Sequence, residues 1–534
     1  MIIARRAFVS AIGALALPRA ARAAPQHRFT LESATIADVN AAMNAGALSA
    51  EALTRLHLAR IARYDPKIRA VITLDPQARA IARALDHERR MHGPRSLLHG
   101  ITIVLKDNID AAGLPTSGGS FVLAQSVPRG DAFIVRRLRN AGAIILGKVN
   151  LSEFAAGPPF SSVHGQTYNP YDHSYIAGGS SGGSGAAIAS GFAFLALGTD
   201  TGGSVRGPAS IDGIVGLKPT TGLLSMAGIM PLALSFDTPG PMGRSVYDVA
   251  AMLGVMVAPD PNDPAKPAPG PPPERDYTRF LDPSALAGAR IGLVRTFSGN
   301  DADHDRVLAD SAAAITAAGG TIVEVTMPAW MMAVKGDFYT TVRWPEFRPQ
   351  FEAYLTTLSS GQPRTLVELA RRSRLLSVPN AQGYIRNDAR WNLFDKEMAS
   401  GSTDDPIYRA MRHDGLTLIR TALEAMLDHD RLDALLYLTT SVRPPRVDEP
   451  AANDTSAAFA STAWATQFAS LAGLPDLVVP AGFTGDGLPI GVSFMGRAYA
   501  EPRLFALGHA FERLRKARRA PPNLPALRGE IVNY

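Results

Sequence analysis

The sequence predicts an α/β fold, in which helices cover a central sheet. Segments with helical periodicity alternate with short apolar runs rich in β-branched residues, which are typical of buried strands. Hydrophobic residues make up 46% of the 534 residues and charged residues 19%, which suffices for a large core and excludes bulk disorder. The regular alternation favours a largely parallel sheet.

The first 23 residues have the features of an export signal. Arg5 and Arg6 precede an apolar stretch, Ala7–Leu17, and small residues in Ala21–Ala23 resemble a cleavage site. The arginine pair resembles a twin-arginine signal, with an ordinary Sec signal as the alternative. We therefore expect an exported, periplasmic protein. No later segment reaches the ~20 apolar residues of a membrane helix, so we expect no membrane association after signal removal.

Charge and cysteine content exclude several classes of function. The net charge is +6, but the first 23 residues hold four arginines and no acid, which leaves +2 for the rest. A body this close to neutral does not indicate a nucleic-acid partner. The chain has no cysteine, which removes thiol nucleophiles and cysteine metal sites. Any nucleophile must be serine, threonine, lysine or a carboxylate.

Two helices are expected near the start of the mature chain. Thr35 and Asp38 form the pattern of a capping box, which predicts that a helix begins there. Ser49 can cap a second helix, which we expect to end at Asp65-Pro66.

Buried strands are expected at two places in the next hundred residues. The run Ile101–Leu105 lies between a glycine and polar residues, and Ala143–Gly147 has the same apolar character. Between them, Asp131 is expected to cap a helix that extends through Arg139. These elements continue the α/β alternation.

The second half of the chain contains a connection and a helical insertion. Residues 258–273 hold eight prolines in sixteen positions, which predicts an extended surface connection. Residues 330–425 have a mostly helical pattern; we interpret the aromatic and methionine cluster at their start as core packing, with a substrate-pocket wall as the alternative. Strand-like runs occur on both sides of the insertion: Ile291–Val294, Thr321–Val325, Ala434–Leu438 and Leu477–Pro480.

A glycine- and serine-rich segment carries the candidate chemistry. Its two fixed points, Ser180 and Ser204, are 24 residues apart. The glycines allow tight turns and leave main-chain N–H groups unshielded. Thr201, Gly202 and Gly203 precede Ser204, so their N–H groups are suited to hold the oxyanion of a tetrahedral intermediate.

These serine blocks, with further motifs on either side, resemble the amidase signature family, serine hydrolases of amide bonds that use a Ser–Ser–Lys triad. The resemblance covers about residues 30–255 well and 430–515 more loosely, and none of its motifs lies in 258–430. The motifs are Leu105-Lys106-Asp107-Asn108, Gly147-Lys148-Val149-Asn150, Gly178–Gly183, Asp200, Gly202–Arg206, Gly216-Leu217-Lys218-Pro219-Thr220, Gly473-Leu474-Pro475, Pro480-Ala481-Gly482 and Gly487–Gly491.

The resemblance implies a role for three residues: Ser204 as nucleophile, Ser180 as bridging serine and Lys106 as terminal base. It also implies a single mixed sheet covered by helices on both faces, a cis peptide bond before Ser180, and a reaction without cofactor or metal. We expect residues 24–534 to form this amidase domain. The expected partner is a small-molecule or peptide-like amide substrate.

The chemistry of the triad can be stated from the residues themselves. A serine hydroxyl needs a base to remove its proton, and lysine is a base only when neutral. Burial of Lys106 at the end of an apolar strand would lower its pKa from ~10.4. Asp107 need not contact it, because successive strand side chains point to opposite faces. Ser180 would then relay the proton of Ser204 to Lys106.

Three residues are assigned to supporting positions around the nucleophile: Ser181, Asp200 and Arg206. Asp200 and Arg206 flank the nucleophile and are suited to pair and brace its loop, with plain surface charges as the alternative.

Three other functions remain open at this point. Gly178–Gly182 also fits the G-x-S-x-G nucleophile elbow of an α/β-hydrolase esterase, with Ser180 as nucleophile and His429 or His509 as base. Within the family, the chain could be the glutamine-hydrolysing subunit of a tRNA-dependent amidotransferase, although the export signal counts against it. A catalytically inactive amidase-like binding protein is the third alternative.

Overall fold

The computed structural model describes most of the chain after the expected signal. The described residues are 27–157, 159–266, 270–375, 386–449 and 465–534. The predicted export segment lies outside them. Within these ranges, no helix is both long and apolar enough to cross a membrane.

The main sheet is mixed, as the family resemblance implied. Strand β3 pairs in parallel with β4 and β7, whereas β13 pairs antiparallel with β8 and β14. The largely parallel sheet that the alternation favoured is therefore wrong, because short connections such as the one from β13 to β14 reverse the chain direction. Within the described residues its eleven strands lie in the order β11 (Thr321–Val325), β10 (Arg290–Val294), β12 (Ala434–Leu438), β14 (Pro489–Met495), β13 (Asp476–Phe483), β8 (Val215–Lys218), β9 (Thr238–Gly243), β7 (Leu195–Asp200), β3 (Thr102–Lys106), β4 (Ile144–Val149) and β2 (Val71–Leu74).

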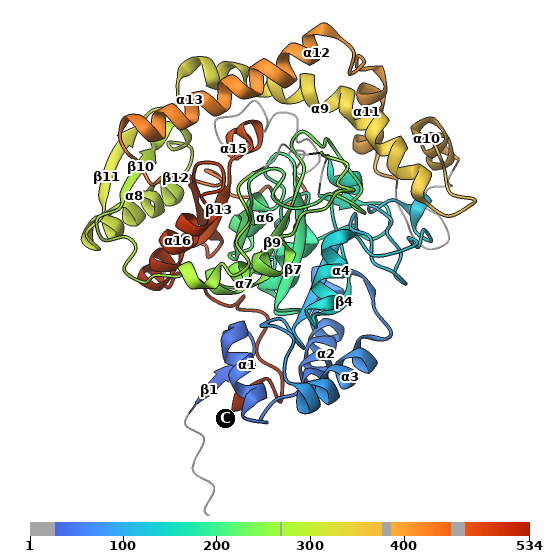
Figure 1. The fold of residues 1–534 in the computed structure, drawn as a ribbon, viewed down its shortest axis with the longest axis vertical. Helices are drawn as coiled ribbons and strands as arrows, with labels where there is room; N and C mark the ends of the chain where they lie inside the picture. Colours follow the sequence, from blue (N-terminus) through green and yellow to red (C-terminus); the bar gives the residue numbers. More distant parts are fainter. Residues whose placement is uncertain (1–26, 158, 267–269, 376–385, 450–464) are drawn as a thin grey trace, which may run out of the picture.

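Helices cover both faces of this sheet (Figure 1). Helices α5 (Gly182–Ala189) and α6 (Arg206–Ile211) pack against each other and against the central strands. A second group packs around α7 (Val246–Met256) and α16 (Glu501–Arg515). Helices α3 (Ala78–His92) and α8 (Ala302–Ala317) also pack on the sheet, and α4 (Phe133–Asn140) packs against α7. The α/β prediction is confirmed.

The N-terminal helices follow the expected caps but end differently. Helix α1 (Ile36–Asn44) begins with the predicted capping box of Thr35 and Asp38. Helix α2 (Ala50–Ile68) continues past Pro66, so the expected stop there is wrong. Pro66 lies in the last turn, where its missing N–H costs only one helical hydrogen bond. The two chain ends pair next to these helices, as β1 (Arg28–Thr30) and β15 (Ile531–Asn533).

Helix α4 is not capped by Asp131 as predicted. It begins at Phe133, and its N-cap residue makes no side-chain capping bond. The carboxylate of Asp131 instead accepts a hydrogen bond from Ala112 N–H (2.7 Å) and pairs with Arg139 (3.2 Å). The side chain is thus used to hold a neighbouring loop and the end of the helix.

A layer of helices, which we name the helical cover, connects β11 to β12. It arches over the top of the molecule in Figure 1, with α15 (Gln467–Ala472) packed against α9 and α13. The Pro-rich connection, where described, contains neither helix nor strand. The cover comprises α9 (Ala329–Thr357), α10 (Leu366–Arg374), α11 (Asp388–Ala399), α12 (Pro406–Ala410), the π-helical turn η5 (Met411–Gly415) and α13 (Leu416–His429).

A short hairpin near the active-site loops completes the described strands. It consists of β5 (Phe160–Ser161) and β6 (Gly165–Gln166). The loop that follows it leads to the glycine- and serine-rich segment before α5, and so places that segment against the ends of β3 and β4.

Candidate active site

The site forms where the parallel strands β3 and β7 end. The register pairs Leu105 with Leu197, so Lys106 at the end of β3 and Thr199 near the end of β7 reach the same edge of the sheet. Both strands are buried along their whole length, and the Lys106 side chain is fully buried. The fold therefore brings this lysine to the residues that follow β7.

Oxygen atoms surround the Lys106 amine. Its Nζ lies 2.7 Å from Ser180 Oγ, 2.9 Å from Thr199 Oγ1 and 3.2 Å from the carbonyl oxygen of Thr199. Asn108 Nδ2 donates to the same Thr199 hydroxyl at 3.1 Å and so fixes its position. The first link of the predicted proton relay, from Ser180 to Lys106, is thus formed.

Burial favours the neutral form of this amine. Removal from water lowers the pKa of Lys106 to about 7, although Asp200 and Asp237 act in the opposite direction. A neutral amine has two N–H groups and one lone pair. The two oxygens of Thr199 can accept both N–H groups, which leaves the lone pair for the hydroxyl proton of Ser180.

The neighbouring Asp107 faces away from this amine, as expected for successive strand residues. Its Oδ1 lies 3.1 Å from Lys148 Nζ, and its Oδ2 accepts a hydrogen bond from the Ser117 hydroxyl. Because this carboxylate has its own cationic partner, it does not hold Lys106 in the charged form.

Ser180 lies two residues before the start of α5 and is 4% exposed. The peptide bond between Gly179 and Ser180 is cis, as the resemblance implied. The side-chain partner of Ser180 is Lys106, whereas His429 lies at the exposed end of α13 and His509 on α16. The esterase alternative requires a histidine next to Ser180, so the geometry disfavours it.

Ser204 lies in the turn between β7 and α6 and is half-buried. Its carbonyl oxygen accepts a hydrogen bond from Ser181 N–H at 3.2 Å, which ties the two serine blocks together. In the part of the chain that the structure describes, the Ser204 hydroxyl makes no hydrogen bond, so the second link of the relay is not formed. Catalytic hydrogen bonds commonly tighten only when substrate is bound.

A buried ion-pair network holds the Ser204 turn. Arg206 contacts Asp200 at 2.9 Å and Asp476 at 2.8 Å, and all three side chains are fully buried. Although burial acts to raise it, the Arg206 guanidinium lowers the pKa of Asp200 to about 2. Tyr437 donates to Asp476 at 2.6 Å. Asp200 and Arg206 therefore brace the turn and are not surface charges.

One expected oxyanion donor is engaged elsewhere. The Gly203 N–H donates to Asp200 Oδ1 at 2.8 Å, which departs from the role predicted for it. Gly203 has φ of 128°, and a Cβ at this position would lie 2.2 Å from Thr466 Oγ1. Only glycine fits here, so the residue shapes the turn.

The remaining turn residues are held by groups that the motifs did not reveal. Thr201 Oγ1 donates to Asp237 (2.5 Å), whose pKa burial raises to about 7. Thr466 Oγ1 donates to the carbonyl oxygen of Gly202 (2.9 Å), and Tyr339 of α9 lies over the same glycine. Asp237 and Thr466 come from distant segments, so their position depends on the whole fold.

A supporting contact of Ser181 and the missed Thr199 complete the geometry. Ser181 Oγ donates to the Thr199 carbonyl oxygen at 3.2 Å, beside the Lys106 amine. Thr199 directly precedes Asp200, and strand alternation places the two on opposite faces. Strand alternation could therefore have assigned Thr199 to the face of β7 that meets Lys106.

No group of three or more His, Cys, Asp or Glu that could hold a metal occurs among the described residues.

Comparison with known proteins decides the family. The family model named Amidase matches residues 52–505. The chain belongs to the amidase family. As an amidase, it is a hydrolase that acts on amide bonds.

Relatives of this amidase include enzymes with different partners. Peptide amidase from Stenotrophomonas maltophilia is 38% identical with a TM-score of 0.83, covers 92% of this chain and 98% of its own, and was also solved with the competitive inhibitor chymostatin. A glutamyl-tRNA(Gln) amidotransferase subunit from Myxococcus xanthus is 36% identical over 90% of this chain and 97% of its own. The solved structure of the corresponding protein from Thermotoga maritima is 26% identical, with a TM-score of 0.67, over 92% of this chain and 98% of its own.

Proposed function

We propose that this amidase hydrolyses its substrate through an acyl-enzyme on Ser204, with Ser180 and Lys106 as the proton relay. Ser204 Oγ attacks the amide carbon while its proton passes to Ser180 and the proton of Ser180 passes to Lys106. The relay then returns a proton to the nitrogen of the leaving amine as the C–N bond breaks. Water attacks the ester by the same route and releases the acid.

The carrying observation is the Lys106 amine itself. It is fully buried, its pKa is lowered to about 7, and it lies 2.7 Å from Ser180 Oγ. A group that is half neutral near pH 7 can both take and return a proton in one cycle. A buried lysine beside a serine hydroxyl is therefore suited to take the proton of Ser180 and to return it.

Main-chain N–H groups of the Ser204 turn would stabilise the tetrahedral oxyanion. Since Gly203 N–H is engaged by Asp200, the donors proposed here are the N–H groups of Thr201 and Ser204. The buried Arg206 network fixes the turn in advance, which is what electrostatic stabilisation of a transition state requires.

The proposed substrate is a carboxylic or peptide-like amide. The basis is the likeness to the Stenotrophomonas peptide amidase, which extends over 92% of this chain. Its 38% identity and TM-score of 0.83 exceed the values for the Thermotoga amidotransferase protein.

The test is hydrolysis of a small panel of amides and esters by the purified mature chain and three variants. Ser204→Ala, Ser180→Ala and Lys106→Ala are each expected to lose amide hydrolysis by orders of magnitude while keeping the unfolding temperature of the parent. Mass spectrometry after rapid quenching should show the acyl group on wild type only. A Ser204→Ala enzyme with the parental rate would refute the mechanism.

A second candidate is the glutamine-hydrolysing subunit of an amidotransferase. The 36% identity to the Myxococcus protein over 90% of this chain favours it. This role predicts glutaminase activity that rises when the other subunits of such a complex are added. Glutamine turnover that is absent under both conditions, beside hydrolysis of other amides, would exclude it.

Export to the periplasm is part of the proposal. It is supported by the arginine pair, apolar stretch and small-residue site of residues 1–23. Fractionation of cells and N-terminal sequencing test it: the expected mature chain begins near Ala24. Replacing Arg5 and Arg6 by lysine should stop export by a twin-arginine route and leave Sec export intact.

A further inference from the structure

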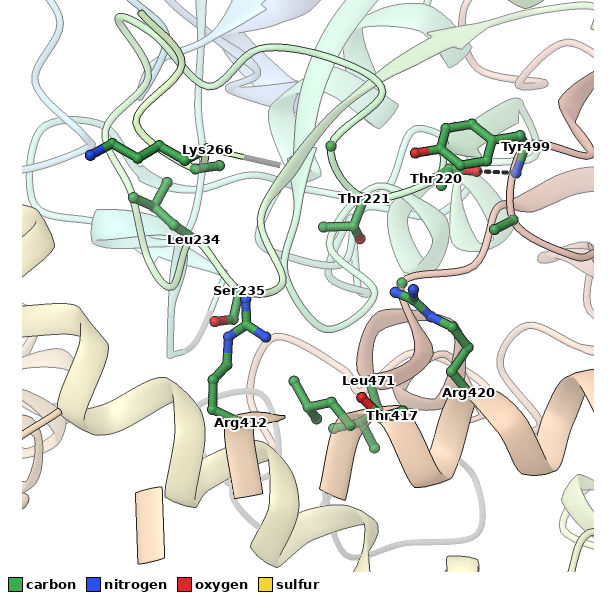
Figure 2. A pocket seen from close by; sticks show the side chains of 15 residues that line it. Thr220, Thr221, Leu234, Ser235, Lys266, Arg412, Thr417, Arg420, Leu471 and Tyr499 are labelled. Carbon is green, nitrogen blue, oxygen red and sulfur yellow. Dashed lines mark hydrogen bonds between the residues drawn. The ribbon is translucent and has the colours of Figure 1, made fainter. Parts of the chain in front are cut away.

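A cavity lies between the helical cover and the loop that joins β8 to β9. Its volume is about 270 Å³. Figure 2 shows that Arg412 of η5 and Arg420 of α13 extend into it from one side, while Thr221 and Ser235 lie on the other. A cavity slightly smaller than the ~300–1,000 Å³ of drug-sized sites fits one small molecule or one side chain.

The lining of this cavity is cationic. Arg412, Arg420 and Lys266 line it, and none of its lining residues in the described chain is an aspartate or glutamate. Both guanidinium groups point into the gap in Figure 2, whereas the Lys266 ammonium lies at the rim and points away. The whole chain has 54 basic and 48 acidic residues, so composition alone does not produce such a lining.

A main-chain hydrogen bond holds the Arg420 guanidinium in place, and a carboxylate lies near the guanidinium of Arg412. Arg420 Nε donates to the carbonyl oxygen of Ala472 at 2.6 Å. Arg412 Nε lies 3.8 Å from Glu346 Oε1, an oxygen that also accepts a hydrogen bond from the Tyr408 hydroxyl at 2.9 Å. The Nε bond of Arg420 leaves its outer N–H groups directed toward the cavity, and Figure 2 shows the Arg412 guanidinium pointing into the same space. Paired planar N–H donors are the geometry that binds a carboxylate.

We propose that this pocket binds a carboxylate group between Arg412 and Arg420. Two guanidinium groups supply charge-assisted hydrogen bonds to its two oxygens, and the Thr221 hydroxyl on the opposite wall supplies a third polar contact.

The pocket shares two structural segments with the Ser204 turn. Ser235 of the pocket wall is two residues before Asp237, which accepts the hydrogen bond of Thr201. Leu471 of the wall lies on α15, next to the segment in which Thr466 bonds the Gly202 carbonyl. The pocket is therefore built from segments that also contact the turn of Ser204.

The carboxylate has two possible sources. It can be an acidic group on the amide substrate, in which case this inference rests on the proposed function. It can also be a free carboxylic acid, such as the product that amide hydrolysis releases. The chemistry of recognition is the same, and separate measurements distinguish the sources.

Binding of free acids is measured first, in a Ser204→Ala background. Calorimetric titration with acetate and succinate should show binding that weakens at least about tenfold in the Arg412→Gln/Arg420→Gln double variant and at high salt. Arg409→Gln is the matched control, because Arg409 lies on α12 and pairs with Asp404 outside the pocket. Arg412→Lys/Arg420→Lys should retain part of the affinity. This arm does not depend on amide hydrolysis.

Kinetics with paired amides tests the other source. Two amides are compared that differ only in an acidic or a neutral side chain. In the double glutamine variant, the KM of the acidic amide should rise at least about tenfold and that of the neutral amide less than twofold. A change in affinity for free acids identifies a free carboxylic acid as the ligand, and a change in the KM ratio identifies an acidic group of the substrate. If neither the affinity for free acids nor the KM ratio changes, while the variant keeps its unfolding temperature, the proposal is overturned.

Discussion

Two buried lysines lie on neighbouring strands at one edge of the sheet and contact different groups. Lys106 ends β3, and its amine lies against the hydroxyls of Ser180 and Thr199. Lys148 in β4 forms an ion pair with Asp107 at 3.1 Å and donates to Thr116 Oγ1 at 2.9 Å. Both side chains have no exposed surface.

The comparison shows that the partner of a buried lysine decides its use. A carboxylate at hydrogen-bond distance favours the ammonium and makes the pair structural. Among the described residues, Lys106 has no carboxylate within hydrogen-bond distance, and burial lowers its pKa to about 7. Two successive residues at the end of β3 thus differ in their surroundings: Lys106 contacts hydroxyl groups, and Asp107 pairs with Lys148.

The largest difference between the two lysines should appear in activity. Lys106→Met removes the base and leaves an apolar side chain of similar length, so kcat should fall by about 10²–10⁴-fold while stability is kept. The measurement is kcat on the best amide of the panel, with urea unfolding alongside. A Lys106→Met enzyme that retains the parental kcat would show that this amine is not in the relay.

For stability, we expect the larger effect from substitution of Lys148 and the smaller one from substitution of Lys106. Lys148→Met leaves the Asp107 carboxylate buried without its cation, which is expected to cost about 3–5 kcal/mol in the free energy of unfolding. Urea denaturation measures this loss. The double variant Lys148→Met/Asp107→Asn removes both charges and should recover much of it. If the single variant is as stable as the parent, the ion pair does not stabilise this edge.

The local part of the candidate site can be predicted from the sequence, and the structure brings Lys106 and Ser180 together. Lys106 was placed by the apolar run before it, and Ser180 and Ser204 by the glycine-rich blocks around them. Each depends on residues adjacent in the chain. Asp237 and Thr466 were missed, because their contacts with the Ser204 turn exist only after segments far apart in sequence have packed together.

The same reason explains what the sequence could not predict of the fold. The α/β class and most strands follow from local periodicity, whereas the mixed strand order depends on which strands pair across the chain. The cationic pocket has no motif, since Arg412 and Arg420 meet Thr221 across some two hundred residues. Asp131 failed as a helix cap because its carboxylate accepts a hydrogen bond from Ala112 N–H instead, and Pro66 failed as a helix stop because in the last turn it removes only one helical hydrogen bond.

The pH–rate profile should have an acidic limb, a region in which kcat/KM decreases as the pH falls below about 7. Lys106 must be neutral to act as a base, and its pKa is lowered to about 7. Below that value the amine is protonated, so kcat/KM should fall about tenfold per pH unit as pH decreases. Above it the rate should level off. A pH–rate profile with a stable buffer series measures this.

Asp237 requires a control, because burial raises its pKa to about 7 as well and it bonds Thr201. In Asp237→Asn the acidic limb should persist, whatever the change in rate, and should move to lower pH because the Asp237 carboxylate raises the pKa of Lys106. A limb that disappears in this variant would assign the titration to Asp237 and not to Lys106.

The smallest expected effect concerns Thr199, which separates the surroundings of Lys106 from those of Lys148. Thr199→Val removes the hydroxyl that accepts from Lys106 at 2.9 Å but keeps the shape of the side chain and the carbonyl contact. This hydrogen bond contributes ~1 kcal/mol net and holds the amine in one position. Without it, kcat should fall by about five- to tenfold. Its loss also removes an acceptor for the ammonium, so the acidic limb should move to lower pH.

Thr116→Val makes the matching change beside Lys148, and it should alter neither kcat nor the limb, since that lysine is held by Asp107. Equal effects of the two substitutions on kcat would mean that the two lysines do not differ in the way their contacts indicate.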